Sequence, residues 1–85
     1  MQQARIIGIL ITDRIKESGQ TQKVLTQHGN IIKSRLGFHE VSEAICSRVG
    51  MVILQLSGQP EQWDQFEKDL SKIDGIQVKN MSFDF

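Results

Sequence analysis

The stretch from Val49 to Leu56 constrains the fold more than any other part of the chain. It reads Val-Gly-Met-Val-Ile-Leu-Gln-Leu, contains no charged residue, and ends at the turn-forming sequence Ser57-Gly58-Gln59-Pro60. This composition predicts a β-strand. Because side chains alternate along a strand, apolar residues occupy both of its faces, which is typical of a central strand. One face holds Val49, Met51 and Ile53, and the other holds Val52, Leu54 and Leu56.

Residues 5–12 form a second predicted strand with two apolar faces. Ile7, Ile9 and Ile11 point one way, whereas Ile6 and Leu10 point the other way. The two apolar strands are therefore expected to be neighbours in the middle of one sheet. Gly8 leaves a gap where another backbone or side chain can approach closely.

The first predicted helix runs from Asp13 to about His28. Asp13 is a favourable N-cap, and Lys23 and His28 suit the negative end of the helix dipole. Gly29 follows at the position where a left-handed residue commonly ends a helix. The alternative is a start as late as Ser18, because the residues after Ser18 favour helix only weakly.

Polar and apolar residues alternate over residues 30–38, which predicts a strand. Its charged side chains suit the edge of the sheet, where they discourage unwanted pairing with another strand. Lys33 and Arg35 share one face with Ile31. The other face holds Ile32, Ser34, Leu36 and Phe38. Residues 39–47 then connect to the strand at 49–56, with Val41, Ala44 and Ile45 either turned inward or extending that strand backwards.

Pro60 marks the start of a second helix, since proline fits a first helical turn and Glu61 favours the positive end of the dipole. Apolar residues then recur at spacings of three, four and three, which predicts one buried stripe: Trp63, Phe66, Leu70 and Ile73. Asp74-Gly75 ends this helix, and residues 76–83 form a fourth strand with Ile76 and Val78 on one face.

The predicted order is β-α-β-β-α-β in one domain, residues 1–85. Right-handed crossovers place both helices on one face of a four-stranded antiparallel sheet, with the strands at 5–12 and 49–56 in the centre. This arrangement is the α+β ferredoxin-like sandwich.

The uncovered face of such a sheet predicts self-association. Burial of one aliphatic side chain contributes roughly 1.5–3 kcal/mol, so leaving several apolar side chains in water is unfavourable. We expect a homo-oligomer, a dimer or tetramer, formed through the sheet face. The alternative is that bulky neighbours on the edge strands and the tail from Met81 to Phe85 fold over this face.

Composition limits which cellular compartment and which binding partners are expected. Ten basic and ten acidic residues cancel, and the central strands lack aromatic residues, so direct nucleic-acid binding is not expected. The single cysteine, Cys46, cannot form an internal disulfide. The apolar run from Ile6 to Ile11 is too short for a signal peptide or a membrane span. We expect a cytoplasmic protein without membrane association.

Three stretches carry a family resemblance: Ile7-Gly8-Ile9-Leu10-Ile11-Thr12-Asp13-Arg14, Gly29-Asn30-Ile31-Ile32-Lys33-Ser34-Arg35-Leu36-Gly37 and Asp74-Gly75-Ile76-Gln77-Val78-Lys79. In order and spacing, the chain resembles the small iron-only hydrogenase system regulators. The resemblance implies an ACT-like ferredoxin-fold domain, related to the C-terminal domain of nickel-responsive repressors, that forms dimers or higher oligomers and has a regulatory role.

Two ligand sites are candidates. His28, His39 and Cys46 offer imidazole and thiolate ligands suited to a divalent metal such as nickel or zinc. The alternative is that His28 belongs to the helix end and Cys46 is a small core residue. A small effector is the second candidate, held by the loop at Asp13 and Arg14 and by Arg35, because arginine pairs well with a carboxylate. The alternative is that the arginines are only solvated.

No nucleophile–base pair, glycine-rich phosphate loop or metal-hydrolase motif is recognisable, so we expect neither an enzyme nor a resident cofactor. The sequence favours an oligomeric regulatory or interaction module that acts through a partner protein or a small effector at a subunit interface. A metal-sensing domain and a plain assembly module without a ligand are the alternatives.

Overall fold

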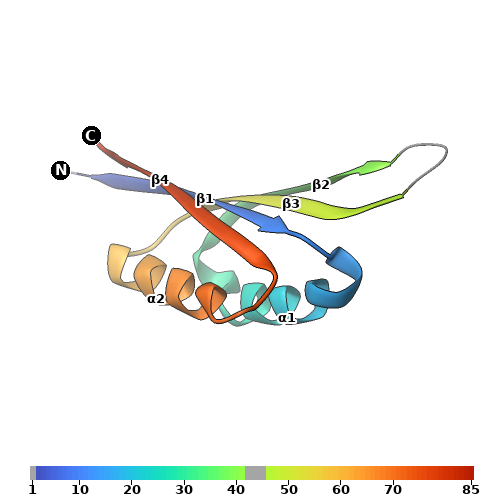
Figure 1. Ribbon diagram of the computed structural model, residues 1–85. Helices are drawn as coiled ribbons and strands as arrows, with labels where there is room; N and C mark the ends of the chain where they lie inside the picture. The colour runs from blue at the N-terminus through green and yellow to red at the C-terminus, as the bar shows by residue number, and fades with distance from the viewer. Residues whose placement is uncertain (1, 42–45) are drawn as a thin grey trace.

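The predicted α+β ferredoxin-like fold is confirmed by the computed structural model, which describes residues 2–41 and 46–85 (Figure 1). The elements are β1 (Gln3–Ile11), α1 (Arg14–Gln27), a short 3-10 helix η1 (Gly29–Ile31), β2 (Ile32–Val41), β3 (Cys46–Leu56), α2 (Pro60–Ser71) and β4 (Ile76–Asp84). The strands form one four-stranded antiparallel sheet in the order β2-β3-β1-β4. Both helices lie on the same side of this sheet.

The core lies between the sheet and the two helices. β1 and β3 are adjacent, with Ile9 opposite Val52, and their helix-facing side chains are buried. Ile7, Ile9 and Leu54 are 0% exposed, as is Phe66 from α2. The alternation predicted for both central strands is therefore confirmed.

α1 begins at the predicted N-cap. The Asp13 carboxylate accepts hydrogen bonds from the backbone N–H groups of Ile15 and Lys16 at 3.2 and 3.3 Å. The later start at Ser18 is therefore wrong, because the cap satisfies donors that the first helical turn leaves free.

The predicted left-handed residue at Gly29 is wrong. Among the described residues, only Gly58 and Gly75 have positive φ, and Gly29 instead begins η1. In this 3-10 turn the Ile31 N–H donates a hydrogen bond of 3.1 Å to the His28 carbonyl, which satisfies an acceptor at the end of α1. Gly75, at φ 82°, supplies the left-handed turn before β4, where a Cβ atom would lie 3.0 Å from the Glu17 carboxyl group.

Ile32 lies on the opposite face of β2 from the one predicted, because the strand is irregular next to it. The register shifts between Ile32, which lies opposite Leu56, and Ser34, which lies opposite Gln55. The shift reverses the side-chain alternation, so that Ile32 packs against the helix-side core rather than sharing a face with Leu36.

β2 and β3 are both longer than predicted. β2 continues to Val41 and β3 begins at Cys46, so Val41 extends the preceding strand rather than β3. Ala44 and Ile45 lie outside the described residues.

The C-terminal tail does not fold over the sheet. β4 pairs with β1 as far as Gln3 and Asp84, and backbone hydrogen bonds of 2.6 and 2.9 Å link Gln2 with Phe85. The tail therefore lengthens an edge strand beside the N-terminus (Figure 1). The alternative in which residues 81–85 cover the apolar face is wrong.

Candidate functional site

The side of the sheet that faces away from both helices, here called the open face, carries the most unusual surface of the described chain. Its register brings together exposed apolar side chains from three strands, and half-buried Ile6 and Leu10 of β1 lie among them. The exposed set is Leu36, Val49, Met51, Ile53, Met81 and Phe83. Contiguous apolar surface of this kind marks an interaction site more often than plain solvent-facing surface.

A hollow lies near the middle of the open face, where Gly8 contributes no side chain. The hollow has a volume of about 290 Å³ and is lined by Gly8, Ile9, Leu10, Met51, Gln77 and Lys79. A Cβ atom placed on Gly8 would meet nothing within 4 Å. The gap predicted at Gly8 is therefore confirmed, and it is bounded by three strands.

Lys79 is a charged residue on the open face, at the border of the hollow. It lies directly opposite Gly8 in the β1–β4 register and borders the hollow. No ion pair of Lys79 is found within the described part of the chain. The hollow thus combines apolar walls with one cation at its border.

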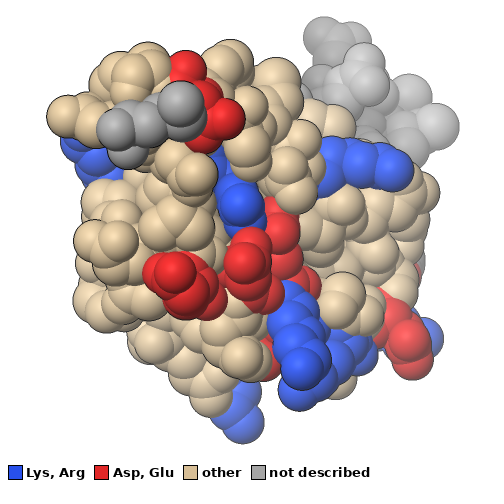
Figure 2. Space-filling view, turned by 90° about the vertical axis from the view of Figure 1, so that its left-hand side faces the viewer, with Lys and Arg blue, Asp and Glu red and all other residues tan. Residues whose placement is uncertain are grey.

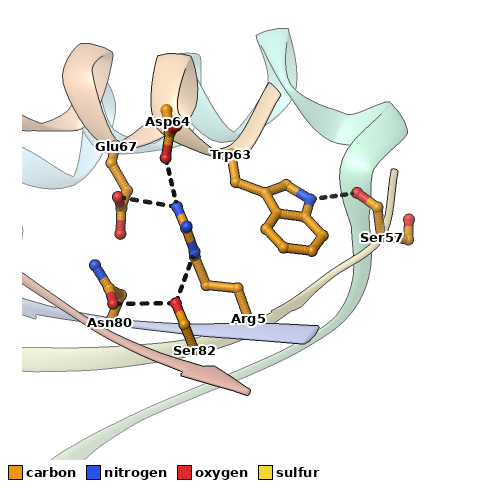
Figure 3. A network of polar contacts seen from close by, with 7 residues as sticks. All are labelled: Arg5, Ser57, Trp63, Asp64, Glu67, Asn80 and Ser82. Atoms are coloured by element: carbon orange, nitrogen blue, oxygen red, sulfur yellow. Dashed lines mark hydrogen bonds and ion pairs between the residues drawn. The ribbon is translucent and has the colours of Figure 1, made fainter. Parts of the chain in front are cut away.

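Arg5, on the helix side of β1, has a very different environment (Figure 3). Its guanidinium lies 2.8 Å from Asp64 and 3.3 Å from Glu67, and its Nε–H donates to the Ser82 hydroxyl at 3.0 Å. The guanidinium also lies 5.3 Å from the centre of the Trp63 ring. These contacts tie α2 to β1 and β4, so the Arg5 network has a structural role.

Sequence reasoning missed both Arg5 and Lys79, although strand alternation could have found them. Arg5 has the parity of Ile7 and therefore faces the helices. Lys79 has the parity opposite to Val78 and therefore faces outward. A charged residue within an otherwise uncharged run of a strand, such as Arg5 in β1, is the signal that marks such a position.

The three residues considered as metal ligands occupy different parts of the fold. His28 follows α1 in the helix layer, where its Nε2 lies 2.8 Å from the Asp69 Oδ2 atom and its ring centre lies 5.0 Å from that of Phe66. His39 and Cys46 belong to β2 and β3, near the connection between these two strands, and their side chains lie outside the description. Within the described residues, no group of three or more His, Cys, Asp or Glu is arranged to hold a metal.

The His28 contact lowers the pKa of the Asp69 carboxyl, chiefly through the hydrogen bond from His28 and next through the one from Gln65. A lowered native pKa stabilises the fold above the ordinary value near 3.8, and this contribution is lost as pH falls through the native pKa.

We therefore expect Asp69→Asn to lower the urea midpoint near neutral pH and to lose this effect below about pH 4. The measurement is urea unfolding followed by circular dichroism from pH 7 to pH 2.5. A difference from wild type that grows towards acid would contradict the assignment.

Two of the three candidate effector residues, Asp13 and Arg35, lie apart in the structure. Asp13 caps α1, and Arg14 is the first residue of that helix, although its side chain lies outside the description. Arg35 donates to the Gln22 side-chain oxygen at 2.9 Å. Gln22 follows Asp13 by nine positions, which corresponds to about 13 Å along a helix axis.

Charges on the end of the molecule that bears the two termini are mixed in sign. Figure 2 shows acidic and basic side chains next to one another on this view, with no large area of a single sign. Formal net charge is zero over the whole chain. This view therefore offers no basic surface of the kind that binds a phosphate backbone.

Comparison with known proteins supports the fold class. No family model matches the chain, and no curated protein matches it. An uncharacterized protein from Thermotoga maritima has a similar structure, with a TM-score of 0.80 and 23% sequence identity, covering 98% of this chain and 100% of the other. A nitrogen regulatory PII-like protein from Thiomonas intermedia, bound to ADP, AMP and bicarbonate, has a TM-score of 0.59 and 11% identity, covering 99% and 96% of the two chains.

A de novo designed protein is also similar, with a TM-score of 0.58 and 14% identity over 99% of both chains. These likenesses, all below 25% identity, establish the α+β ferredoxin-like architecture. A fold shared by a regulatory protein and a designed one does not specify an activity, which has to be argued from the site itself. Separately, no described helix has the length and apolar character needed to cross a membrane.

Proposed function

We propose that this protein is an oligomeric regulatory or interaction module that associates with copies of itself through the open face. The observation that carries the proposal is the set of six large apolar side chains exposed on one uncovered sheet face. A second sheet packed against this face would remove these side chains from water, as in the sheet-on-sheet packing of β-sandwiches.

The dimensions of the open face suit a self-association surface. Four strands about 4.8 Å apart and nine to eleven residues long, at about 3.3 Å per residue, give a projected area on the order of 600 Å². A standard interface buries about 800 Å² of accessible surface per partner, and accessible surface exceeds projected area. The exposed side chains that make up most of this face are apolar, so two copies can bury them against each other.

The regulatory part of the proposal draws on two likenesses. One is the structural similarity to a nitrogen regulatory PII-like protein. The other is the resemblance of three stretches of sequence to the iron-only hydrogenase system regulators, which makes such a system the proposed setting. In that setting the module would act through a partner protein or respond to a small effector at the subunit interface, and no residue is assigned a catalytic role.

The mass of the protein in solution tests self-association. Light scattering on a dilution series is expected to give a dimer or tetramer of the 9.7 kDa chain at micromolar concentration, with dissociation on dilution. A 9.7 kDa species at every concentration would contradict the proposal.

A further inference from the structure

We propose that the hollow at Gly8 binds a small amphipathic carboxylate, with its aliphatic chain against Leu10 and Met51 and its carboxylate on the Lys79 ammonium. The hollow is present on the single chain. A second chain packed on the open face would cover it, and in this respect the inference rests on the proposed function.

The apolar part of the ligand is indicated by the shape and lining of the hollow. Gly8 opens the middle of a face that is otherwise filled by larger side chains, and Leu10 and Met51 supply apolar walls. A volume of about 290 Å³ lies just below the usual range for ligand pockets, about 300–1,000 Å³. The space therefore suits a short aliphatic chain rather than a nucleotide.

The acidic part of the ligand is indicated by Lys79. On the helix side of the sheet, Arg5 is neutralised by Asp64 and Glu67. On the open face, by contrast, no acidic side chain is available to Lys79 among the described strand positions. Because burial of an unpaired charge is costly, a second copy placed over Lys79 would favour an anion that accompanies it.

A carboxylate fits this position better than a phosphate group. Phosphate sites commonly use several backbone N–H groups at a helix N-terminus, and both helices of this protein lie on the opposite side of the sheet (Figure 1). The hollow offers one cation together with the Gln77 side-chain amide, which can donate one hydrogen bond. These two donor groups correspond to the two oxygens of a carboxylate.

Ligand binding and association are consequently coupled. A ligand that neutralises Lys79 in the closed hollow binds the assembled form better than the single chain, and by linkage it strengthens assembly. In the competing arrangement, the Lys79 side chain extends past the edge of the sheet and keeps its ammonium in water, because β4 is an edge strand. In that arrangement the charge needs no anion.

The test is isothermal titration with octanoate, and with uncharged octanamide, at a protein concentration where the oligomer is present. Wild type is expected to bind octanoate at least about tenfold more tightly than octanamide, as a charge-assisted contact implies. Lys79→Met retains the aliphatic stem and is expected to bind the two compounds equally. Lys23→Met removes an exposed lysine from α1 and should leave the preference for octanoate unchanged.

Filling the hollow provides a second, independent variant. Gly8 does not have positive φ and has open space at its Cβ position, so Gly8→Leu is expected to fold. It should abolish binding of both compounds, while circular dichroism confirms native structure. Equal binding of octanoate and octanamide to wild type, retained preference in Lys79→Met, or undiminished binding to Gly8→Leu would each overturn the inference.

Light scattering on the same samples separates this inference from the proposed function. An oligomer that fails to bind octanoate overturns only the ligand site. A monomer that binds octanoate through Lys79 overturns only self-association. The expected result is that octanoate shifts the dilution midpoint of wild type to lower protein concentration and leaves that of Lys79→Met unchanged.

Discussion

Ile53→Lys is expected to convert the oligomer into a folded monomer. Ile53 lies on the open face of β3, opposite Gly8 in β1 and Leu36 in β2, and is 36% exposed in the single chain. In a monomer the new ammonium reaches water at little cost, whereas in a sheet-on-sheet interface it would be buried beside Lys79 without an acidic partner. The cost of several kcal/mol corresponds to a weakening of association by a factor on the order of a hundred or more.

Light scattering measures this effect, and circular dichroism checks that the variant keeps its secondary structure. Gln27→Lys is the matched control, because it introduces the same charge at the exposed last residue of α1, near the favourable end of the helix dipole. The control should retain the wild-type mass. If Ile53→Lys also retains it, the interface does not include the open face.

Leu54→Ala is expected to destabilise the fold strongly, whereas Ile53→Ala should not. The two residues are neighbours in β3 but lie on opposite faces, with Leu54 0% exposed in the core and Ile53 exposed. Truncation of a fully buried leucine costs about 2–5 kcal/mol, which is a large part of the stability of a small domain, about 5–15 kcal/mol.

Urea unfolding at two protein concentrations distinguishes the two effects. Leu54→Ala should lower the unfolding midpoint at both concentrations. Ile53→Ala should change the midpoint little where the protein is monomeric, and should lower it at high concentration, where wild type is further stabilised by association. A loss of several kcal/mol for Ile53→Ala in the monomer would mean that the open face contributes to the core of the single chain.

The candidate site was only partly predictable from the sequence. Gly8 could be recognised as a gap because it interrupts a run of large aliphatic residues. That the gap borders Lys79 depended on the β1–β4 register, which pairs residues 71 positions apart and has no local sequence signal. The contact between His28 and Asp69 similarly joins the end of α1 to α2 across the helix layer.

By itself, the sequence determined the order of elements, the central position of β1 and β3, and the helix-facing core. These features follow from local periodicity, because burial of alternating or helically spaced apolar side chains requires those elements to pack together. The tertiary structure decided the irregularity that turns Ile32 inward, the pairing of the tail with β1 beyond Met81, and the position of Lys79 beside Gly8. Each of these depends on which residues lie opposite one another across strands, a relation that the free energy of the whole sheet sets and that no local stretch of sequence specifies.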